Sequence, residues 1–392
     1  MRLWYEMRNL SALWMGILTI PIALADDPNA LQTQAAKQAS NSSVDPPLQL
    51  KQYFQPPAEL AKDFGNYRSP LIFDDGTAVM NAADWPKRRA EVVKYWHAAM
   101  GEWPPLIERP TIELSTQELR GVVTQYAIRI ETAPGRIVDD AFLLIPAGQG
   151  PFPAVVVVYY EANTGIGRGK SELRDFALQL AQRGFVTLSL GGDPNTYYPT
   201  VEQCRIQPLS FHAYEAATCC NALANRPDVD PHRIGVVGHS YGGKWAMFAS
   251  CLYDKFACGA VSDPGIVFDE SRGNVNYWEP WYLGFDPKLS KQRKSGIPNE
   301  QNPRTGPYEK MMAEGRDLTE LHALMAPRPF FVSGGAEDSP ERWRALNHLV
   351  AVNKLLGAEN RVAMTNRPAH APTTDSNEQL YAFFEWALKP AK

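Results

Sequence analysis

The chain contains little cysteine, with five among 392 residues. They lie in one stretch, at Cys204, Cys219, Cys220, Cys251 and Cys258. None of the spacings is that of a zinc site and none of the thiols lies beside a suitable base, so zinc-ribbon and cysteine-nucleophile chemistry are set aside. An odd number leaves one cysteine unpaired, and an oxidising compartment would be compatible with one or two disulfides.

Charge of one sign is also lacking. Lys and Arg number 39 and Asp and Glu number 43, for a net charge of −4. This balance gives no basis for binding nucleic acid or an anionic membrane surface. The hydrophobic fraction of 44% and the length are those of a globular protein, and one large domain with insertions is the better interpretation than two small ones.

The chain has no long hydrophobic run. Residues 10–24 are almost uncharged but fall short of the ~20 residues that a membrane-spanning helix needs. Arg2 and Arg8 precede this run, and Ala23-Leu24-Ala25 follows the pattern of a signal-peptidase site. Residues 1–25 are therefore predicted to be a signal peptide of a secreted or periplasmic protein, with no membrane partner. Residues 26–50, rich in Asn, Gln, Ser and Pro, are predicted to be a disordered leader.

From residue 51 onwards the pattern is that of folded structure. Residues 51–110 are predicted to form a helical arm whose helix, about residues 81–103, is anchored by Trp96 and Trp103. Residues 111–392 are predicted to form an α/β domain, because apolar strands alternate with helices. The predicted strands are 111–115, 122–131, 137–146, 154–159, 185–190, 233–237, 258–262, 329–333 and 361–365, and the predicted helices of this domain are 171–183, 210–225 and 378–388.

The sequence Gly-His-Ser-Tyr-Gly at residues 238–242 follows a β-branched apolar run and precedes a helix-prone stretch. This is the G-x-S-x-G nucleophile elbow in its expected strand–turn–helix setting. The turn strains the serine, so Gly238 and Gly242 are needed because they lack a Cβ. We predict that Ser240 is the nucleophile and that the Tyr241 backbone N–H faces the oxyanion.

A serine hydroxyl needs a base, and seven histidines are available. Six are predicted to lie on helices, at a strand entrance or beside the nucleophile: His97, His212, His232, His239, His322 and His348. His370 alone lies in a loop just after the last predicted strand, at the same sheet edge as Ser240. We therefore predict that His370 is the base.

Two carboxylates could orient that base. Asp338 follows the next-to-last strand and a glycine turn, which gives the chain order Ser, Asp, His expected of this fold, and it is the first choice. Its neighbour Glu337 is interpreted as a solvated charge. The alternative acid is Asp263, which directly follows the strand after the elbow.

The remaining predicted site residues concern the oxyanion and the substrate. A backbone N–H of Tyr160 or Glu161, after the strand at 154–159, is expected to be the second oxyanion donor. Residues 264–320 lack regular periodicity and are predicted to form a cap over the substrate pocket. In this cap, Trp278 and Trp281 are the predicted substrate-binding residues.

Together the elbow, the late Asp and the late His resemble the α/β-hydrolase superfamily over about residues 105–388. The Ala-Pro-Arg-Pro at residues 326–329 is similar to that of dienelactone-hydrolase-like and acetyl xylan esterase-like proteins. Gly-x-Ser-x-Gly-Gly-Lys and the Trp-rich cap also resemble glucuronoyl esterases, in which the acid can follow the strand after the elbow. Those enzymes carry an arginine where this chain has Tyr241.

The resemblance implies an α/β-hydrolase fold, with a mostly parallel sheet, helices on both faces and a cap. It also implies a secreted serine esterase that acts on a small-molecule or glycan ester, acetyl or glucuronoyl, with neither metal nor organic cofactor. Two alternatives stay open. The elbow is similar to that of prolyl-oligopeptidase-type peptidases, although no propeller repeat precedes it. A non-catalytic binding protein that retains the fold is the other.

Overall fold

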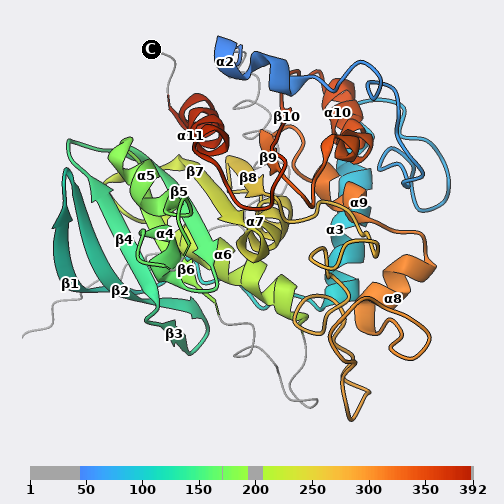
Figure 1. Ribbon diagram of the computed structural model, residues 1–392, viewed down its shortest axis with the longest axis horizontal. Helices are drawn as coiled ribbons and strands as arrows, with labels where there is room; N and C mark the ends of the chain where they lie inside the picture. The colour runs from blue at the N-terminus through green and yellow to red at the C-terminus, as the bar shows by residue number, and fades with distance from the viewer. Residues whose placement is uncertain (1–44, 170, 193–205, 390–392) are drawn as a thin grey trace, which may run out of the picture. The chain divides into compact units, whose positions relative to one another are not determined.

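The computed structural model of the protein describes residues 45–169, 171–192 and 206–389 (Figure 1). The predicted signal peptide, residues 26–44 of the predicted leader, and Cys204 lie outside the described residues. The end of that leader is ordered, contrary to the prediction: helix α2 (Leu48–Lys51) begins within it, and the Leu50 side chain is buried. Leu50 packs with Phe54 of the short helix η1 (Gln52–Phe54) in a hydrophobic cluster.

Within these described residues a ten-stranded sheet forms the centre of the fold, in the spatial order β1-β2-β4-β6-β5-β7-β8-β9-β10, with β3 paired to β2. The strands are β1 (Ile112–Arg120), β2 (Val123–Ala133), β3 (Arg136–Val138), β4 (Ala141–Pro146), β5 (Phe152–Tyr159), β6 (Val186–Gly191), β7 (Val229–His239), β8 (Cys258–Ser262), β9 (Phe330–Gly334) and β10 (Val362–Asn366). The pairs among β1, β2, β3, β4 and β6 are antiparallel. From β6 through β5 to β10 all neighbours are parallel. The mostly parallel α/β sheet predicted from the sequence is therefore confirmed.

The apolar run of β5 is explained by burial on both faces of the sheet. Val156 and Val158 belong to one hydrophobic cluster, whereas Val155 and Val157 belong to the other. Successive side chains of a strand point to opposite faces, so a strand covered on both sides has no position for a polar residue.

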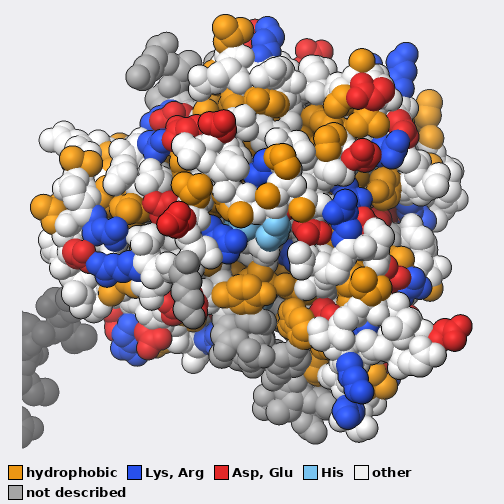
Figure 2. Space-filling view, viewed as in Figure 1, with side chains coloured by type: hydrophobic (Ala, Val, Ile, Leu, Met, Phe, Trp, Pro, Cys, Tyr) orange, Lys and Arg blue, Asp and Glu red, His pale blue; other side chains and the backbone are white. Residues whose placement is uncertain are grey.

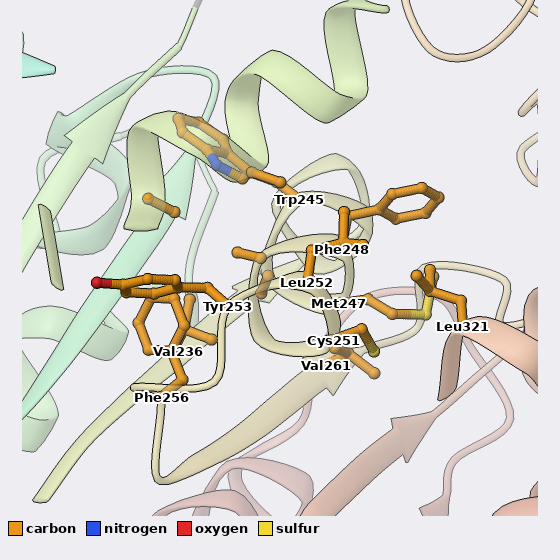
Figure 3. Close-up of a cluster of buried hydrophobic side chains, with 14 of the residues drawn as sticks. Val236, Trp245, Met247, Phe248, Cys251, Leu252, Tyr253, Phe256, Val261 and Leu321 are labelled. Carbon is orange, nitrogen blue, oxygen red and sulfur yellow. The ribbon is translucent and has the colours of Figure 1, made fainter. Parts of the chain in front are cut away.

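Helices cover both faces. The first cluster joins the sheet to helices α3 (Trp85–Met100), α6 (Pro208–Ala224), α7 (Tyr241–Leu252), α9 (Leu318–Ala323) and α10 (Trp343–Leu355). The second cluster joins it to α5 (Phe176–Gln182) and α11 (Thr374–Leu388). Figure 3 shows the side chains of α7 that pack around Val236 of β7 and Leu321 of α9.

The predicted arm helix is present but shorter, as α3. Trp96 is fully buried, and its ring meets that of Phe248 edge-on at 5.8 Å. Trp103 Nε1 donates to Ser210 Oγ at 2.9 Å. These contacts anchor the helix as predicted, and Figure 1 shows α3 beside α9, which is distant in sequence.

Other boundaries differ from the predictions. The strand predicted over residues 137–146 is two strands, β3 and β4, and the helix predicted over residues 171–183 begins only at Phe176. Helix α4 (Ala162–Gly165), directly after β5, was not predicted. Between β8 and α8 (Gly306–Ala313) the chain forms no helix and no strand of the sheet.

The four cysteines of the described ranges are buried free thiols: Cys219, Cys220, Cys251 and Cys258. Burial raises the pKa of each thiol above its ordinary value, to about 12 for Cys220 and Cys251. In those same ranges no helix combines the length and hydropathy that crossing a bilayer requires.

Candidate active site

Ser240 occupies a strained turn between β7 and α7, with φ +56° and ψ −114°. A Cβ on Gly238 would lie 2.2 Å from the Gly242 carbonyl oxygen, and one on Gly242 would lie 2.0 Å from that of Val158. Both approaches are too close for any side chain, so the elbow requires glycine on either side of Ser240. The strained conformation of the predicted nucleophile is therefore present.

Four parallel strands end together beside this turn. His239 of β7 is paired with Ser262 of β8, and Ser262 with Ser333 of β9. The Ser240 backbone N–H donates to the Ser262 carbonyl at 2.8 Å, and the Asp263 N–H donates to that of Ser333 at 3.0 Å. Residues that follow β7 to β10 therefore meet at one edge, where ligands bind in open α/β sheets.

His370 lies in the loop after β10, and its imidazole is paired with Asp263. His370 Nδ1 is 2.7 Å from Asp263 Oδ2. The Asp263 carboxylate is completely buried, whereas the His370 side chain is 27% exposed. The His370 ring also lies 4.7 Å, centroid to centroid, from that of His239, the residue before Ser240. Within residues 206–389 no hydrogen bond joins the Ser240 hydroxyl to His370.

The structure does not support Asp338, the first choice of acid, as the partner of His370. Its carboxylate accepts from the backbone N–H groups of Gly265 at 2.8 Å and Ile266 at 2.6 Å. Burial raises the pKa of Asp338 to about 6, and the negative charge of Asp263 adds to the rise. The contacts of the loops explain the difference: backbone N–H groups take both oxygens of Asp338, whereas Asp263 Oδ2 faces His370 Nδ1.

Asp263 is held by the turn that carries Asp338. Its Oδ1 accepts from the backbone N–H groups of Glu337 at 3.1 Å and Asp338 at 2.9 Å. Its backbone has φ +50°, an uncommon conformation for a residue with a side chain. Each aspartate thus accepts from the backbone of the other's loop, and Asp263 Oδ2, which also accepts weakly from the Glu337 N–H at 3.3 Å, faces the imidazole.

The Tyr241 side chain is turned into the protein. It is 2% exposed, its ring stacks on Tyr160 at 3.8 Å, and its hydroxyl is hydrogen-bonded to His212 Nε2. The phenol is therefore directed away from solvent. The Tyr241 N–H is among the first amides of α7, which point out of the helix N-terminus.

Tyr160 and Glu161 follow β5 as predicted. The Tyr160 side chain is 47% exposed, and a cavity of about 510 Å³ lies beside it. Carboxylates border this cavity: Asp139, Asp140 and Glu161, with Arg136 as the cation among its lining residues. Figure 2 shows a face on which a histidine side chain lies near the centre, bordered by hydrophobic groups and by Lys or Arg.

Trp278 is not placed to bind a substrate, contrary to the prediction. Its side chain is fully buried, and its Nε1 donates to Glu279 at 3.1 Å. Trp281 is half-buried and packs against the core. These aromatic side chains of the predicted cap pack in the core, because burial of their large apolar surface is favourable.

Sequence reasoning missed two buried cations at this edge. Lys244 Nζ donates to the carbonyl oxygens of Pro264 and Asn274, and burial lowers its pKa to about 8. Arg367 lies directly after β10 and donates to the backbone around His370. The only signal for Arg367 was its position after a strand. Across the described residues no cluster of three or more His, Cys, Asp or Glu could hold a metal ion.

No family model matches the chain. Among curated proteins, acyl-coenzyme A thioesterase 3 of Mus musculus is 30% identical over 190 residues, which are 47% of this chain and 40% of that protein. Peroxisomal succinyl-coenzyme A thioesterase of Mus musculus is 28% identical over 172 residues, 43% of this chain and 37% of that protein. The matched segment thus covers less than half of each curated relative.

Solved structures match over more of the chain. A glucuronoyl esterase from Solibacter usitatus superimposes with a TM-score of 0.62 at 18% identity, covering 82% of this chain and 97% of that one. A CE15 glucuronoyl esterase from Teredinibacter turnerae gives 0.58 at 17%, covering 91% and 100%. A putative acetyl xylan esterase from Bacteroides fragilis gives 0.51 at 13%, covering 90% and 89%. The chain thus has the α/β-hydrolase fold.

Proposed function

We propose that the protein is a serine hydrolase that cleaves carboxylic esters through an acyl-enzyme. The observation that carries the proposal is the pair formed by His370 Nδ1 and Asp263 Oδ2, 2.7 Å apart, at the sheet edge where the strained turn holds Ser240. A carboxylate on Nδ1 leaves Nε2 of the same ring to accept a proton from a serine hydroxyl. Catalytic hydrogen bonds are often long without substrate, so the missing Ser240–His370 bond is compatible with this role.

In the proposed mechanism, Ser240 Oγ attacks the ester carbonyl carbon while His370 takes the hydroxyl proton. The tetrahedral intermediate then collapses, and His370 gives the proton to the departing alcohol. Water, deprotonated by the same imidazole, attacks the acyl carbonyl, and the imidazolium then gives that proton back to Ser240 Oγ as the carboxylic acid leaves. Asp263 holds the tautomer and stabilises the imidazolium.

The negative charge of the intermediate needs donors that are already in position. The Tyr241 N–H, at the start of α7, is the first proposed donor. A backbone N–H of Tyr160 or Glu161, in the segment between β5 and α4, is the second. Removal of one such donor costs ~3 kcal/mol of transition-state stabilisation in serine hydrolases.

Carbohydrate-linked esters, acetyl or glucuronoyl, are the proposed substrate class. The structural neighbours are named as glucuronoyl and acetyl xylan esterases, and these likenesses extend over most of the chain. The carboxylates around the cavity beside Tyr160, which is itself partly exposed, are suited to a neutral sugar, whose hydroxyls donate to carboxylates.

An acyl-coenzyme A thioesterase is the second candidate, favoured by the sequence match to acyl-coenzyme A thioesterase 3. Coenzyme A carries phosphates, which the carboxylates Asp139, Asp140 and Glu161 would repel. A carbohydrate ester is therefore favoured over an acyl-coenzyme A thioester as the substrate.

One experiment separates these possibilities. The wild-type protein and Ser240→Ala are assayed on acetyl and longer-chain nitrophenyl esters, an acetylated sugar, a glucuronate methyl ester, an acyl-coenzyme A and a peptide. Both are also labelled with a fluorophosphonate, which reacts only with an activated serine. Sugar-ester turnover and labelling that Ser240→Ala abolishes support the proposal. Preference for the thioester supports the second candidate, and an unlabelled, inactive wild type supports a binding protein.

We further propose that the protein is exported, on the basis of the signal-like sequence at residues 1–25. Expression of the full sequence followed by N-terminal sequencing tests this. A mature protein that begins near Asp26 is expected, whereas a protein that keeps residues 1–25 contradicts export.

A further inference from the structure

Arg367 is a buried cation with an unusually large set of acceptors. It directly follows β10 and is 5% exposed. Its Nη1 donates to the carbonyl oxygen of Ser333 at 2.9 Å, to the hydroxyl of the same residue at 2.9 Å, and to the Gly334 carbonyl at 3.2 Å. Its Nη2 reaches Ser262 Oγ at 3.2 Å. The guanidinium is thereby fixed to the ends of β8 and β9.

The same guanidinium also holds the loop that carries the proposed base. Nη2 donates to the carbonyl oxygen of His370 at 2.7 Å, and Nε donates to that of Ala371 at 2.8 Å. Residues 367–373 form neither helix nor strand, and the backbone ladder to β9 ends at the Arg367 N–H, which donates to the Gly334 carbonyl at 3.1 Å. The Arg367 side chain therefore ties the backbone of this loop to the sheet, in addition to the hydrogen bond between the His370 ring and Asp263.

One acceptor of Arg367, Ser262 Oγ, also contacts His239, the residue before the nucleophile. Ser262 Oγ lies 3.0 Å from His239 Nδ1, and the His239 ring lies 4.7 Å from that of His370. Burial lowers the pKa of His239 well below its ordinary value, so this neighbour is neutral. His370 is thus fixed by the Asp263 carboxylate, by a neutral ring and by its own carbonyl.

We propose that Arg367 is a positioning residue, which holds His370 in the place where its imidazole serves Ser240. This inference rests on the proposed function. Only a guanidinium can make this set of hydrogen bonds, because its planar fork has five N–H donors in a fixed geometry, whereas a lysine has three on one flexible nitrogen. Loss of the fork frees the loop and displaces the base, and a misplacement of about 1 Å costs on the order of 100-fold in rate.

The test uses the full-length protein with Arg367→Lys, Arg367→Met and Arg367→Ala. The matched control is Arg361→Met, since Arg361 is similarly buried, 6% exposed, but lies before β10 at the opposite end of the strand. For Arg367→Met we expect kcat for a nitrophenyl ester to fall on the order of 100-fold, with KM little changed. Fluorophosphonate labelling should slow in parallel, because labelling also needs the base.

The Lys variant should be nearly as impaired as the Met variant, and added guanidinium ion should restore part of the activity of Arg367→Ala. Arg361→Met should lose thermal stability but keep kcat. The inference is overturned if Arg367→Met keeps the wild-type kcat. It is also overturned if Arg367→Met and Arg361→Met each lose activity only in proportion to the fraction of protein that is unfolded. If Ser240→Ala keeps the activity and the fluorophosphonate labelling of the wild type, the proposed function and this inference are both overturned.

Discussion

Asp263 Oδ2 lies 2.7 Å from His370 Nδ1, although 107 residues separate the two in sequence. The carboxylate reaches the ring from the end of β8, the neighbour of the strand that carries Ser240. The other aspartate at this edge, Asp338, is occupied by two backbone N–H groups. The two carboxylates are therefore chemically distinct, and variants can tell them apart.

Replacement of Asp263 by Asn should lower kcat by about 10⁴-fold, because an amide on Nδ1 favours the wrong tautomer of the histidine. Asp338→Asn is the matched control and should change kcat far less, since the Asp338 carboxylate contacts the Gly265 and Ile266 N–H groups and Arg342, and not the imidazole. Steady-state kinetics on a nitrophenyl ester measures both. Equal losses in the two variants would contradict the assignment of Asp263 as the orienting acid.

The buried Asp338 should make stability fall as the pH rises from about 4 to about 6. Its pKa is raised from 3.8 to about 6 in the folded protein, so the folded state binds this proton more tightly than the unfolded state. Protonated Asp338 therefore adds about 3 kcal/mol to the free energy of unfolding below pH 4, and this contribution is lost as the pH rises to 6 and above. Denaturant unfolding between pH 4 and pH 7 should show that the free energy of unfolding of Asp338→Asn increases relative to that of the wild type as the pH rises. A constant difference would contradict the raised pKa.

Gly242→Ala should abolish activity and destabilise the fold. The added methyl would lie 2.0 Å from the Val158 carbonyl oxygen, so β5 and α7 would have to separate. Overpacking of this kind costs about 1–3 kcal/mol. Gly273→Ala is the control, because a Cβ there meets nothing within 4 Å. Melting temperature and fluorophosphonate labelling give the two readouts, and normal labelling of Gly242→Ala would refute the elbow geometry.

Arg88→Met should destabilise the protein by about 3 kcal/mol, because it removes a buried partner of Glu320. Both side chains of this ion pair are at most 1% exposed, and the pair joins α3 to α9. Arg316 and Arg68 remain near Glu320 and limit the loss. Arg89→Met, one residue along, breaks a pair with the 55% exposed Asp254 and should cost at most about 1 kcal/mol. Chemical denaturation compares the two, and equal losses would contradict the buried role of Arg88.

The predictions from sequence that held are those carried by local pattern. A β-branched run followed by Gly-His-Ser-Tyr-Gly admits one turn geometry, since the two glycines are the residues that the strained turn tolerates. The apolar run at residues 154–159 similarly predicts a strand buried on both faces, as found in β5. The start of α5 at Phe176 and the existence of α4 were missed, because short helices carry little periodicity.

The order of residues along the chain left two acids open, and only the contacts made by the folded loops chose between them. Strand order places β8 beside the nucleophile strand and β9 beside β10, so it left both acids at the same edge, and the hydrogen bonds of the loops distinguish them. The same holds for Trp278, because the irregular sequence around it did not reveal that its ring is buried in the core. Arg367 is the clearest case, because its six acceptors come from three segments far apart in the sequence.

The sequence by itself determined the elbow, the alternation of strands and helices, and the loop that holds His370, since each depends on neighbours a few residues away. Tertiary structure alone decided which carboxylate faces the imidazole, which aromatic rings are buried and which cation holds the loop. Those outcomes depend on contacts between segments that only the folded sheet brings together.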